Sequence, residues 1–543
     1  MSTTERIPTV PADSPLALEP AARSRMSVGT LIARALDNFG SETLLIDEDG
    51  SVTYAEFRDR VLRGASALKG LGVVHGEPVG LVAANTRGFC EVEYASVLSG
   101  FVRCAEVPRL HPTEVAGMFA AAGVRVAVVQ PDWVQKLTAV RDRIPTLEHI
   151  VTLGPAVDGA AAWDDLLAAA QPEPITDLPA AEDDAWLVFS SGTTGEPKGI
   201  VLTHGGLANM VRNIHGEVGE LDETDVLVHA APLGHMSGCL FVASMIRGGA
   251  QLLMSSFDGT SLLQAVERHR VTWMIAVPTM LVQLTDLAEE LDLDTSSLRR
   301  IMYGASPMMP DRLVRAIAVF GDIFVQAYGL SEVPMPMTLL RVSAHRFDPA
   351  LPPPQRLKSA GRPVVGVELE VVDEQRQPLP RGSVGEIAIR SDVRMRGYWN
   401  RPELTAEVLS DDGWFYTGDV GRFDEEGYLY IVDRKKDMIV SGGFNVYPNE
   451  VEQAISALPG VLEVAVVGAP DDRWGEAIVA VVVPRPGVTL VPDAIIAGCR
   501  EQIAGYKCPK SVEVWDEIPK SPRGKPLRRA VRDRFWQDAG RSI

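Results

Sequence analysis

Apolar runs alternate with amphipathic helical patterns through the first third of this chain. Thr53 and Glu56 can form a capping box at the start of a helix whose apolar face is Tyr54, Phe57, Val61, Ala65 and Leu68. Strands are predicted at 78–84, 124–129 and 149–153, between helices over 89–100, 113–122 and from 132. Strands that alternate with helices predict a parallel sheet covered on both faces.

The same alternation begins again after residue 200. Helices are predicted over 205–215, after 235 and over 262–269, and strands at 225–230, 251–254 and 273–277. The repetition predicts a second layered α/β lobe. A proline cluster at 349–354 ends this pattern, and the short strands expected at 367–372, 384–390 and 428–432 predict a small antiparallel β-barrel.

The last hundred or so residues form a separate pattern. Helices are predicted over 449–457 and 492–503, and strands at 461–468, 476–483 and 511–515. The fold class is therefore α/β, with a large N-terminal domain (27–435) of two lobes plus a barrel and a small α+β C-terminal domain (436–543). The Pro/Ala/Ser-rich residues 1–26 are expected to be a disordered tail.

Length, net charge and cysteine content limit the classes of function that this chain can have. The chain has 543 residues, too many for one core, and its net charge of −20 disfavours nucleic acid and anionic membranes as partners. No apolar run reaches about 18 residues, so no integral membrane segment is expected. Five scattered cysteines without a C-x-x-C pair favour a reduced, cytoplasmic setting without zinc or disulfides.

A polar, glycine-rich loop follows the apolar run 185–189. Glycines allow backbone N–H groups to approach an anion, and hydroxyls and a lysine add hydrogen bonds and charge, so the loop predicts a phosphate cradle made by Ser190, Ser191, Gly192, Thr193, Thr194, Gly195 and Lys198. It is not the common P-loop, because no Ser or Thr follows the lysine. The alternative is a flexible surface turn.

Small residues and an aromatic lie at two further strand ends. The segments 303–307 and 326–332 each follow a strand-like run, and open α/β sheets bind ligands at such ends. Glu332 is a carboxylate in an otherwise apolar stretch, so it could bind Mg²⁺ together with phosphate oxygens. Taken alone, an isolated glutamate is more often a surface residue.

These segments form an ordered set with Tyr416-Thr-Gly-Asp419, Asp433-Arg434 and Pro519 to Lys525. Over about residues 27–535 the set resembles the adenylate-forming superfamily of acyl- and aryl-CoA ligases, carrier-protein adenylation domains and luciferases. The resemblance implies a reaction in two steps. ATP and a small-molecule carboxylic acid give acyl-AMP and pyrophosphate, and a thiol, that of coenzyme A, then displaces AMP.

The resemblance also implies roles for individual residues. Ser190 to Lys198 would hold the β- and γ-phosphates, and Glu332 would bind Mg²⁺. The adenine would pack against Gly304, Ala305, Ser306, Pro307 and Tyr328. Ser331, close to Gly329 in the nucleotide site, would contact the α-phosphate, and Asp419 with Arg434 would bind the ribose hydroxyls.

In this superfamily the small C-terminal domain rotates between the two steps. Lys525 matches the lysine that assists the first step, although it also belongs to a basic tail that could be a solvated surface. Lys436 matches the hinge, and Gly442 and Gly443 match the segment that lines the pantetheine tunnel. Tyr506-Lys507 lies where relatives meet the CoA end.

His235 lies in Pro232 to Gly238, the segment where relatives place an aromatic residue or histidine beside the acyl site. Alone, it would more often be a packed core histidine. No acidic residue occurs in this segment, which argues against an α-amino acid, and apolar residues predict an aryl or medium-length alkyl acid. The predicted wall is Met236, Gly304, Gly329, Val333, Pro334, Met335 and Met337.

Other functions remain open at the level of sequence. The acyl group could pass to the phosphopantetheine of a separate carrier protein or to another nucleophile, and an oxyanion other than a carboxylate could be activated. A degenerate nucleotide sensor is disfavoured, because the charged set is complete at Lys198, Glu332, Asp419, Arg434 and Lys525.

Overall fold

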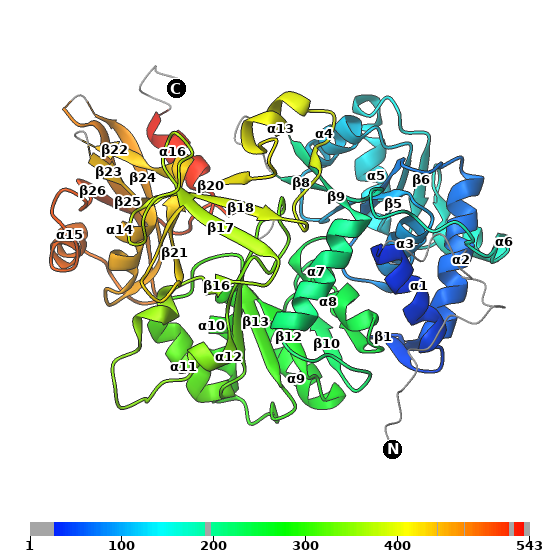
Figure 1. Cartoon of the computed structure of the whole chain (residues 1–543), viewed down its shortest axis with the longest axis horizontal. Helices are drawn as coiled ribbons and strands as arrows, with labels where there is room; N and C mark the ends of the chain where they lie inside the picture. The colour runs from blue at the N-terminus through cyan, green and yellow to red at the C-terminus, as the bar shows by residue number, and fades with distance from the viewer. Residues whose placement is uncertain (1–25, 191–196, 442–443, 472, 521–525, 537–543) are drawn as a thin grey trace. The chain divides into compact units, whose positions relative to one another are not determined.

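The computed structural model describes residues 26–190, 197–441, 444–471, 473–520 and 526–536 (Figure 1). The chain divides into two compact units. The first unit is Met1–Glu368 with Arg390–Phe415, and the second is Leu369–Ile389 with Tyr416–Ile543. The tail predicted over 1–26 lies outside the described residues except for Met26. The predicted domain boundary near residue 436 stays a prediction.

The first unit contains a sheet, here called the first sheet, with eight described strands in the order β19-β9-β8-β4-β3-β5-β6-β7. β3 pairs in parallel with β4 and β5, as the alternating pattern predicts, and β8 and β9 form an antiparallel pair. The bounds are β3 Pro78–Val82, β4 Val102–Glu106, β5 Val126–Val129, β6 His149–Thr152, β7 Ala161–Ala162, β8 Asp184–Ser190, β9 Lys198–Thr203 and β19 Gly397–Tyr398.

The second sheet of this unit has nine described strands in the order β16-β15-β14-β13-β12-β10-β11-β1-β2. β10 to β14 pair in parallel, and the early strand β1 joins them beside β11. The bounds are β1 Thr43–Asp47, β2 Gly50–Thr53, β10 Val226–His229, β11 Ala250–Leu253, β12 Trp273–Ala276, β13 Arg300–Gly304, β14 Phe324–Tyr328, β15 Thr338–Leu340 and β16 Arg362–Pro363.

Helices cover these sheets (Figure 1). α2 begins after Thr53, which forms the predicted capping box with Glu56. The helices are α1 Val28–Asn38, α2 Tyr54–Gly70, α3 Arg87–Leu98, α4 Pro112–Ala122, α5 Pro131–Thr138, α6 Trp163–Ala169, α7 His204–Glu217, α8 Met236–Met245, α9 Gly259–His269, α10 Pro278–Glu290, α11 Pro310–Phe320, α12 Val342–His345 and α13 Pro402–Val408. Short 3-10 turns occur at Arg141–Arg143 and Gln355–Lys358.

The second unit contains the C-terminal α+β pattern with its own apolar core. β25 pairs with β24 and β22 on one path and with β26 in parallel. The elements are β22 Ile439–Ser441, β23 Phe444–Val446, α14 Pro448–Ser456, β24 Val461–Asp471, β25 Gly475–Pro484, α15 Pro492–Arg500, β26 Ser511–Val514 and α16 Arg528–Trp536. All the helices and strands predicted after residue 449 are present within a few residues of their predicted bounds.

A four-stranded sheet stands where the sequence predicted a small barrel. Its described strands follow the linear order β17-β18-β20-β21, at Val367–Val372, Gly385–Ser391, Phe415–Phe423 and Leu429–Arg434. The prediction of a barrel was wrong, because β17 and β21 are the two edges of this sheet and do not pair with each other. Of the other short strands in this part of the described chain, β16 pairs with β15 of the second sheet and β19 with β9 of the first. A short turn at Lys435–Asp437 follows β21.

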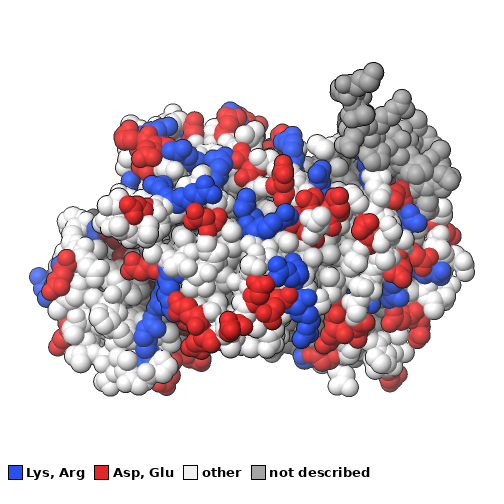
Figure 2. Space-filling model, turned by 90° about the horizontal axis from the view of Figure 1, so that it is seen from below, with Lys and Arg blue, Asp and Glu red and all other residues white. Residues whose placement is uncertain are grey.

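Charged side chains of both signs share the surface. Figure 2 shows acidic and basic side chains interspersed over the face that it draws. Arg125, for example, contacts both Glu77 and Glu148. None of the helices in the described part of the chain combines the length and hydropathy needed to span a bilayer.

Candidate functional site

Lys198, Tyr398 and Glu332 meet in the first unit, although they are far apart in the sequence. Lys198 is the first residue of β9, and its Nζ lies 5.5 Å from the centre of the Tyr398 ring. The Tyr398 hydroxyl donates to Glu332 Oε1 at 3.2 Å. The β9 to β19 pairing holds Tyr398 opposite Ile200. One tyrosine therefore contacts both the lysine of the predicted phosphate loop and the carboxylate predicted to bind Mg²⁺.

The Tyr398 phenol stays protonated in this setting. Burial raises its pKa well above the usual value, and the negative charge of Glu332 raises it further. A protonated phenol can donate to Glu332 Oε1 and so orient the Glu332 carboxylate. Such a half-buried carboxylate fits Mg²⁺, which prefers hard oxygen donors and often takes one protein carboxylate plus phosphate oxygens.

The two predicted adenine segments lie side by side. β13 and β14 pair in parallel with Gly304 opposite Ala327, so both segments leave the same edge of the second sheet. A Cβ at Gly304 would lie 2.3 Å from the Ala327 carbonyl oxygen, which no side chain tolerates. Ala305 has φ of +68°, a left-handed conformation that costs a non-glycine residue energy. Such outliers are common at ligand sites.

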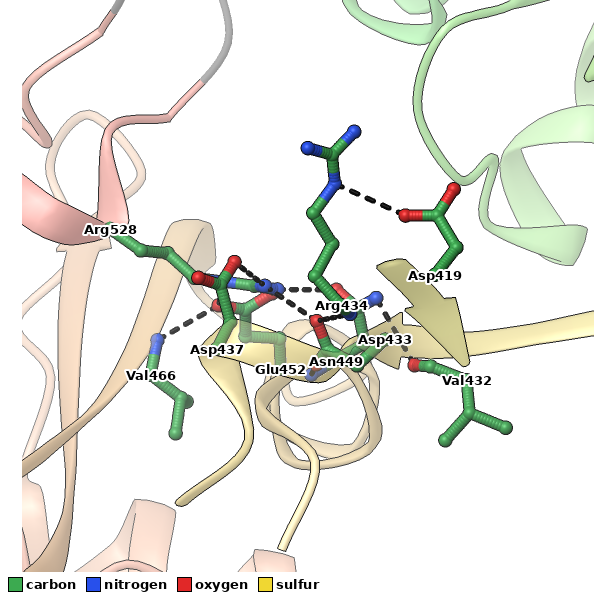
Figure 3. Close-up of polar contacts among 9 residues, drawn as sticks. All are labelled: Asp419, Val432, Asp433, Arg434, Asp437, Asn449, Glu452, Val466 and Arg528. Carbon is green, nitrogen blue, oxygen red and sulfur yellow. Dashed lines mark hydrogen bonds and ion pairs between the residues drawn. The ribbon is translucent and has the colours of Figure 1, made fainter. Parts of the chain in front are cut away.

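Asp419 and Arg434 pair across β20 and β21 of the second unit. The strands place them directly opposite each other, and Arg434 Nε lies 3.2 Å from Asp419 Oδ1. Asp419 is buried while Arg434 is about half exposed (49%). The arginine side chain therefore orients the carboxylate that the resemblance assigns to the ribose (Figure 3).

Arg528 ties together the segment that contains the predicted hinge and the C-terminal core (Figure 3). Its Nη1 donates to Asp433 Oδ1 at 2.9 Å, and its Nε donates to Glu452 Oε1 at 2.8 Å. Asp437 lies 3.5 Å from Nη1. Burial raises the pKa of Asp433 and Glu452, and Arg528 opposes both shifts. Lys436 itself is exposed between Asp433 and Asp437.

Aromatic rings and cations gather on part of the second unit. The rings of Phe444 and Tyr506 lie 4.8 Å apart, Lys507 Nζ is 5.7 Å from the Tyr506 ring, and Lys510 Nζ is 4.9 Å from the Trp474 ring. We call Phe444, Trp474, Tyr506, Lys507 and Lys510 the aromatic–cationic surface. The two segments that the resemblance assigns to CoA thus contact each other here.

His235 is half-buried at the N-cap of α8, in the loop that follows β10. At the end of β10, His229 Nδ1 pairs with Ser237 Oγ at 2.7 Å, and His229 Nε2 pairs with Gln251 Oε1 at 2.8 Å. Val333, Met335 and Met337, which were predicted to line the acid pocket, are all buried. The first turn of α8 therefore rests on a buried polar network.

Three buried histidines should make the first unit sensitive to acid. Burial lowers the pKa of His204, His229 and His345 to about 4. Since the unfolded chain binds these protons near pH 6.5, stability falls as the pH drops below 6.5 and toward 4, by about 2 kcal/mol per histidine at pH 5. His345 pairs with the Tyr303 hydroxyl at 2.9 Å.

The stability difference between wild type and His345→Gln should therefore shrink by about 2 kcal/mol between pH 7 and pH 5, measured by urea denaturation. The glutamine variant has no imidazole at position 345 to protonate, whereas His204 and His229 contribute equally to both proteins. A difference that stays constant over this range would mean that His345 accepts a proton equally well in the folded and unfolded chain.

Several predicted residues cannot be placed. The side chain of Ser190 and all of Ser191, Gly192, Thr193, Thr194, Gly195, Gly442, Gly443 and Lys525 lie outside the described residues. Tyr398 and Arg528 were missed by the sequence analysis. Arg528 lies three residues after Lys525 in the basic tail, where one more arginine gives no separate signal. Tyr398 lies between a glycine and a tryptophan, and this local sequence does not indicate its contacts.

Two layered α/β lobes and a separate α+β unit match the architecture that the resemblance to adenylate-forming enzymes predicts. Comparison with known proteins agrees, since residues 32–399 match the AMP-binding enzyme family and residues 450–525 match the AMP-binding enzyme C-terminal domain. The chain belongs to the family of AMP-binding enzymes. The predicted family membership is confirmed, and so is the predicted α/β fold class with a large N-terminal and a smaller C-terminal domain.

Named relatives and solved structures support this placement. The chain is 36% identical over 536 residues to the medium/long-chain-fatty-acid-CoA ligase FadD8 of Mycobacterium tuberculosis (strain ATCC 25618 / H37Rv), covering 96% of this chain and 92% of that protein. It is 38% identical to a feruloyl-CoA synthase of an Amycolatopsis species, covering 89% and 94%. The amide bond synthetase McbA of Marinactinospora thermotolerans superposes with a TM-score of 0.84 at 32% identity, covering 94% and 100%.

Proposed function

We propose that this enzyme activates a carboxylic acid with ATP and transfers the acyl group to coenzyme A. In the first step a carboxylate oxygen attacks the α-phosphorus of ATP, so that acyl-AMP forms and pyrophosphate leaves. In the second step the CoA thiolate attacks the acyl carbon and AMP leaves. The relatives FadD8 and feruloyl-CoA synthase are named for such CoA products.

The contact of Tyr398 with both Lys198 and Glu332 is the observation that best supports the first step. Phosphoryl transfer needs alignment and charge neutralisation more than covalent help from the protein. Lys198 would neutralise phosphate oxygens, and Glu332, oriented by Tyr398, would hold Mg²⁺. The metal supplies charge stabilisation at the phosphates when it is bound.

The proposed acid is an aryl or medium-length alkyl acid. Val333, Met335 and Met337 are buried apolar side chains on the segment that follows Glu332, and methionine adapts to varied shapes. His235 would contact the acid in this proposed site. A pyrophosphate-release screen over aryl, alkenoic and alkanoic acids, with and without CoA, tests the substrate and the acceptor together. Release that no acid stimulates would overturn the proposal.

The aromatic–cationic surface favours CoA as the acceptor. The CoA nucleotide combines a flat base with several phosphates. The Phe444 and Tyr506 rings suit the base, and the exposed Lys510 beside Trp474 suits a phosphate, whereas Lys507 is paired with Glu450 at 2.6 Å. A second candidate is transfer to another nucleophile, which the structural likeness to the amide bond synthetase McbA favours. Thioester formation with free CoA separates the two candidates.

Lys510→Glu should raise the KM for CoA by about tenfold, since the change replaces a phosphate-binding charge with a repelling one. The KM for the acid should stay within about twofold, measured by steady-state thioester formation. Lys520→Glu is the matched control, because Lys520 lies in the same unit and pairs with Glu463 at 2.6 Å. Equal effects of both variants would argue against a CoA role for this surface.

A further inference from the structure

The loop that carries His235 is held by a side chain from the other sheet of its unit. Asn85 lies just beyond β3 of the first sheet, and its Nδ2 donates to the carbonyl oxygens of His229 and Ala231, each at 2.9 Å. Its Oδ1 accepts from the Leu233 amide at 2.9 Å. One amide therefore contacts alternate residues of the loop that leads to His235.

Asn85 is buried, and its environment determines which way the amide points. Two carbonyl oxygens face Nδ2 and one N–H group faces Oδ1, so a flipped amide would lose these hydrogen bonds. An aspartate has nearly the same shape but cannot donate to carbonyl groups when it is ionised. These contacts therefore need an asparagine for its hydrogen atoms as well as for its volume.

The backbone around Asn85 is also held in place. The Ala84 amide donates to Gln130 Oε1 at 3.0 Å, and Thr86 caps α3 by accepting from the Phe89 amide at 3.2 Å. A fixed main chain on both sides means that Asn85 loses little conformational freedom when it binds the loop.

Other buried groups hold the same loop. Arg103, on β4, donates to the Leu233 carbonyl at 3.4 Å, so both backbone polar groups of Leu233 are engaged by the first sheet. Gly238 has no room for a side chain, because a Cβ there would lie 2.2 Å from the Leu233 carbonyl oxygen. The pairing of His229 Nδ1 with Ser237 Oγ at 2.7 Å also holds the first turn of α8.

We infer that Asn85 is a positioning residue that sets the placement of His235 at the acid site. The inference rests on the proposed function, in which His235 contacts the acid. Asn85 acts through the backbone of residues 229–233, and its loss would let His235 shift without removing the imidazole. Small displacements of a positioned group reduce turnover strongly in well-ordered sites.

Asn85→Asp and Asn85→Ser should each lower kcat/KM for the acid in ATP–pyrophosphate exchange by roughly 10- to 100-fold. The KM for ATP should change by less than about threefold, since the affected loop is not among the predicted nucleotide segments. Thr285→Val is the matched control, because Thr285 is a buried polar residue of the same unit whose hydroxyl donates to the Leu281 carbonyl within α10. It should leave the exchange rate close to that of wild type.

The double variants with His235→Ala give the decisive measurement. If Asn85 acts through His235, Asn85→Asp should cost less than about threefold in the His235→Ala background. Additive losses, or Asn85→Asp activity equal to wild type, would overturn the inference. If His235→Ala alone leaves the exchange unchanged, His235 has no role at the acid site, and the inference about Asn85 fails with it. The single variant therefore tests the role of His235, and the double variant tests whether Asn85 acts through it.

Hydrogen exchange provides a readout that does not depend on activity. In the intact Asn85→Ser protein, the Leu233 amide should exchange at least about tenfold faster than in wild type, while amides of β3 keep their protection. Unchanged protection at Leu233 would mean that Asn85 does not hold the loop, whatever the kinetics show.

Discussion

Replacing Lys525 with alanine should slow acid-dependent ATP–pyrophosphate exchange by about 100-fold to 1000-fold. The reason is electrostatic, because charge develops on the α-phosphate as the carboxylate oxygen attacks, and a flexible cation can follow it. Thioester formation from supplied acyl-AMP should persist, since that step starts after AMP has been joined to the acid.

The matched control for this variant is Lys520→Ala. Lys520 is in the same basic tail, but its Nζ pairs with Glu463 at 2.6 Å on the surface of the second unit. Loss of an exposed pair changes stability by about 1 kcal/mol or less and should leave the exchange close to wild type. Exchange that survives Lys525→Ala would remove this lysine from the mechanism, and loss of both half-reactions would indicate a folding defect instead.

Glu332→Gln should reduce kcat/KM for MgATP by about 100-fold or more, because a neutral amide binds Mg²⁺ far more weakly than a carboxylate. Raising the Mg²⁺ concentration should recover part of the lost rate. The measurement is initial-rate adenylation over a range of Mg²⁺ concentrations at fixed ATP.

Tyr398→Phe tests the orientation of the Glu332 carboxylate independently of its charge. The variant keeps the ring near Lys198 and the charge of Glu332 but removes the hydroxyl that donates to Glu332 at 3.2 Å. Loss of a group that orients a metal ligand typically lowers metal affinity or activity by about 10-fold to 100-fold. The loss of rate should therefore be smaller than in Glu332→Gln and should disappear at a high Mg²⁺ concentration. A Glu332→Gln enzyme with the wild-type Mg²⁺ dependence would rule out the predicted metal site.

The elements that the sequence predicted best have either a continuous apolar run or a regular apolar face. The β3 strand is buried throughout, and the C-terminal strands and helices have one apolar face, so local patterns were sufficient to predict them. The β4 strand was missed because Arg103 and Glu106 interrupt its apolar run. Arg103 is buried there because it meets Glu93 at 3.4 Å and stacks on Trp186.

The candidate site was predicted in part. Motif order identified Lys198, Glu332, Asp419 and Arg434, because each lies in a segment with a recognisable composition. Tyr398 and Asn85 were not identified, since a single tyrosine or asparagine between ordinary residues has no pattern of its own. Their roles depend on partners more than 60 residues away along the chain.

The sequence by itself determined the alternation of strands and helices, the class of chemistry and the family, because these depend on local periodicity and on motifs that are contiguous in the chain. Only the tertiary structure decided which side chains meet. Three features of this protein depend on contacts between residues that are far apart in the sequence. They are the burial of Arg103, the contact of Tyr398 with Lys198 and Glu332, and the hydrogen bonds of Asn85 to the loop before His235. They come from how the sheets bring remote segments together, and no local pattern encodes that arrangement.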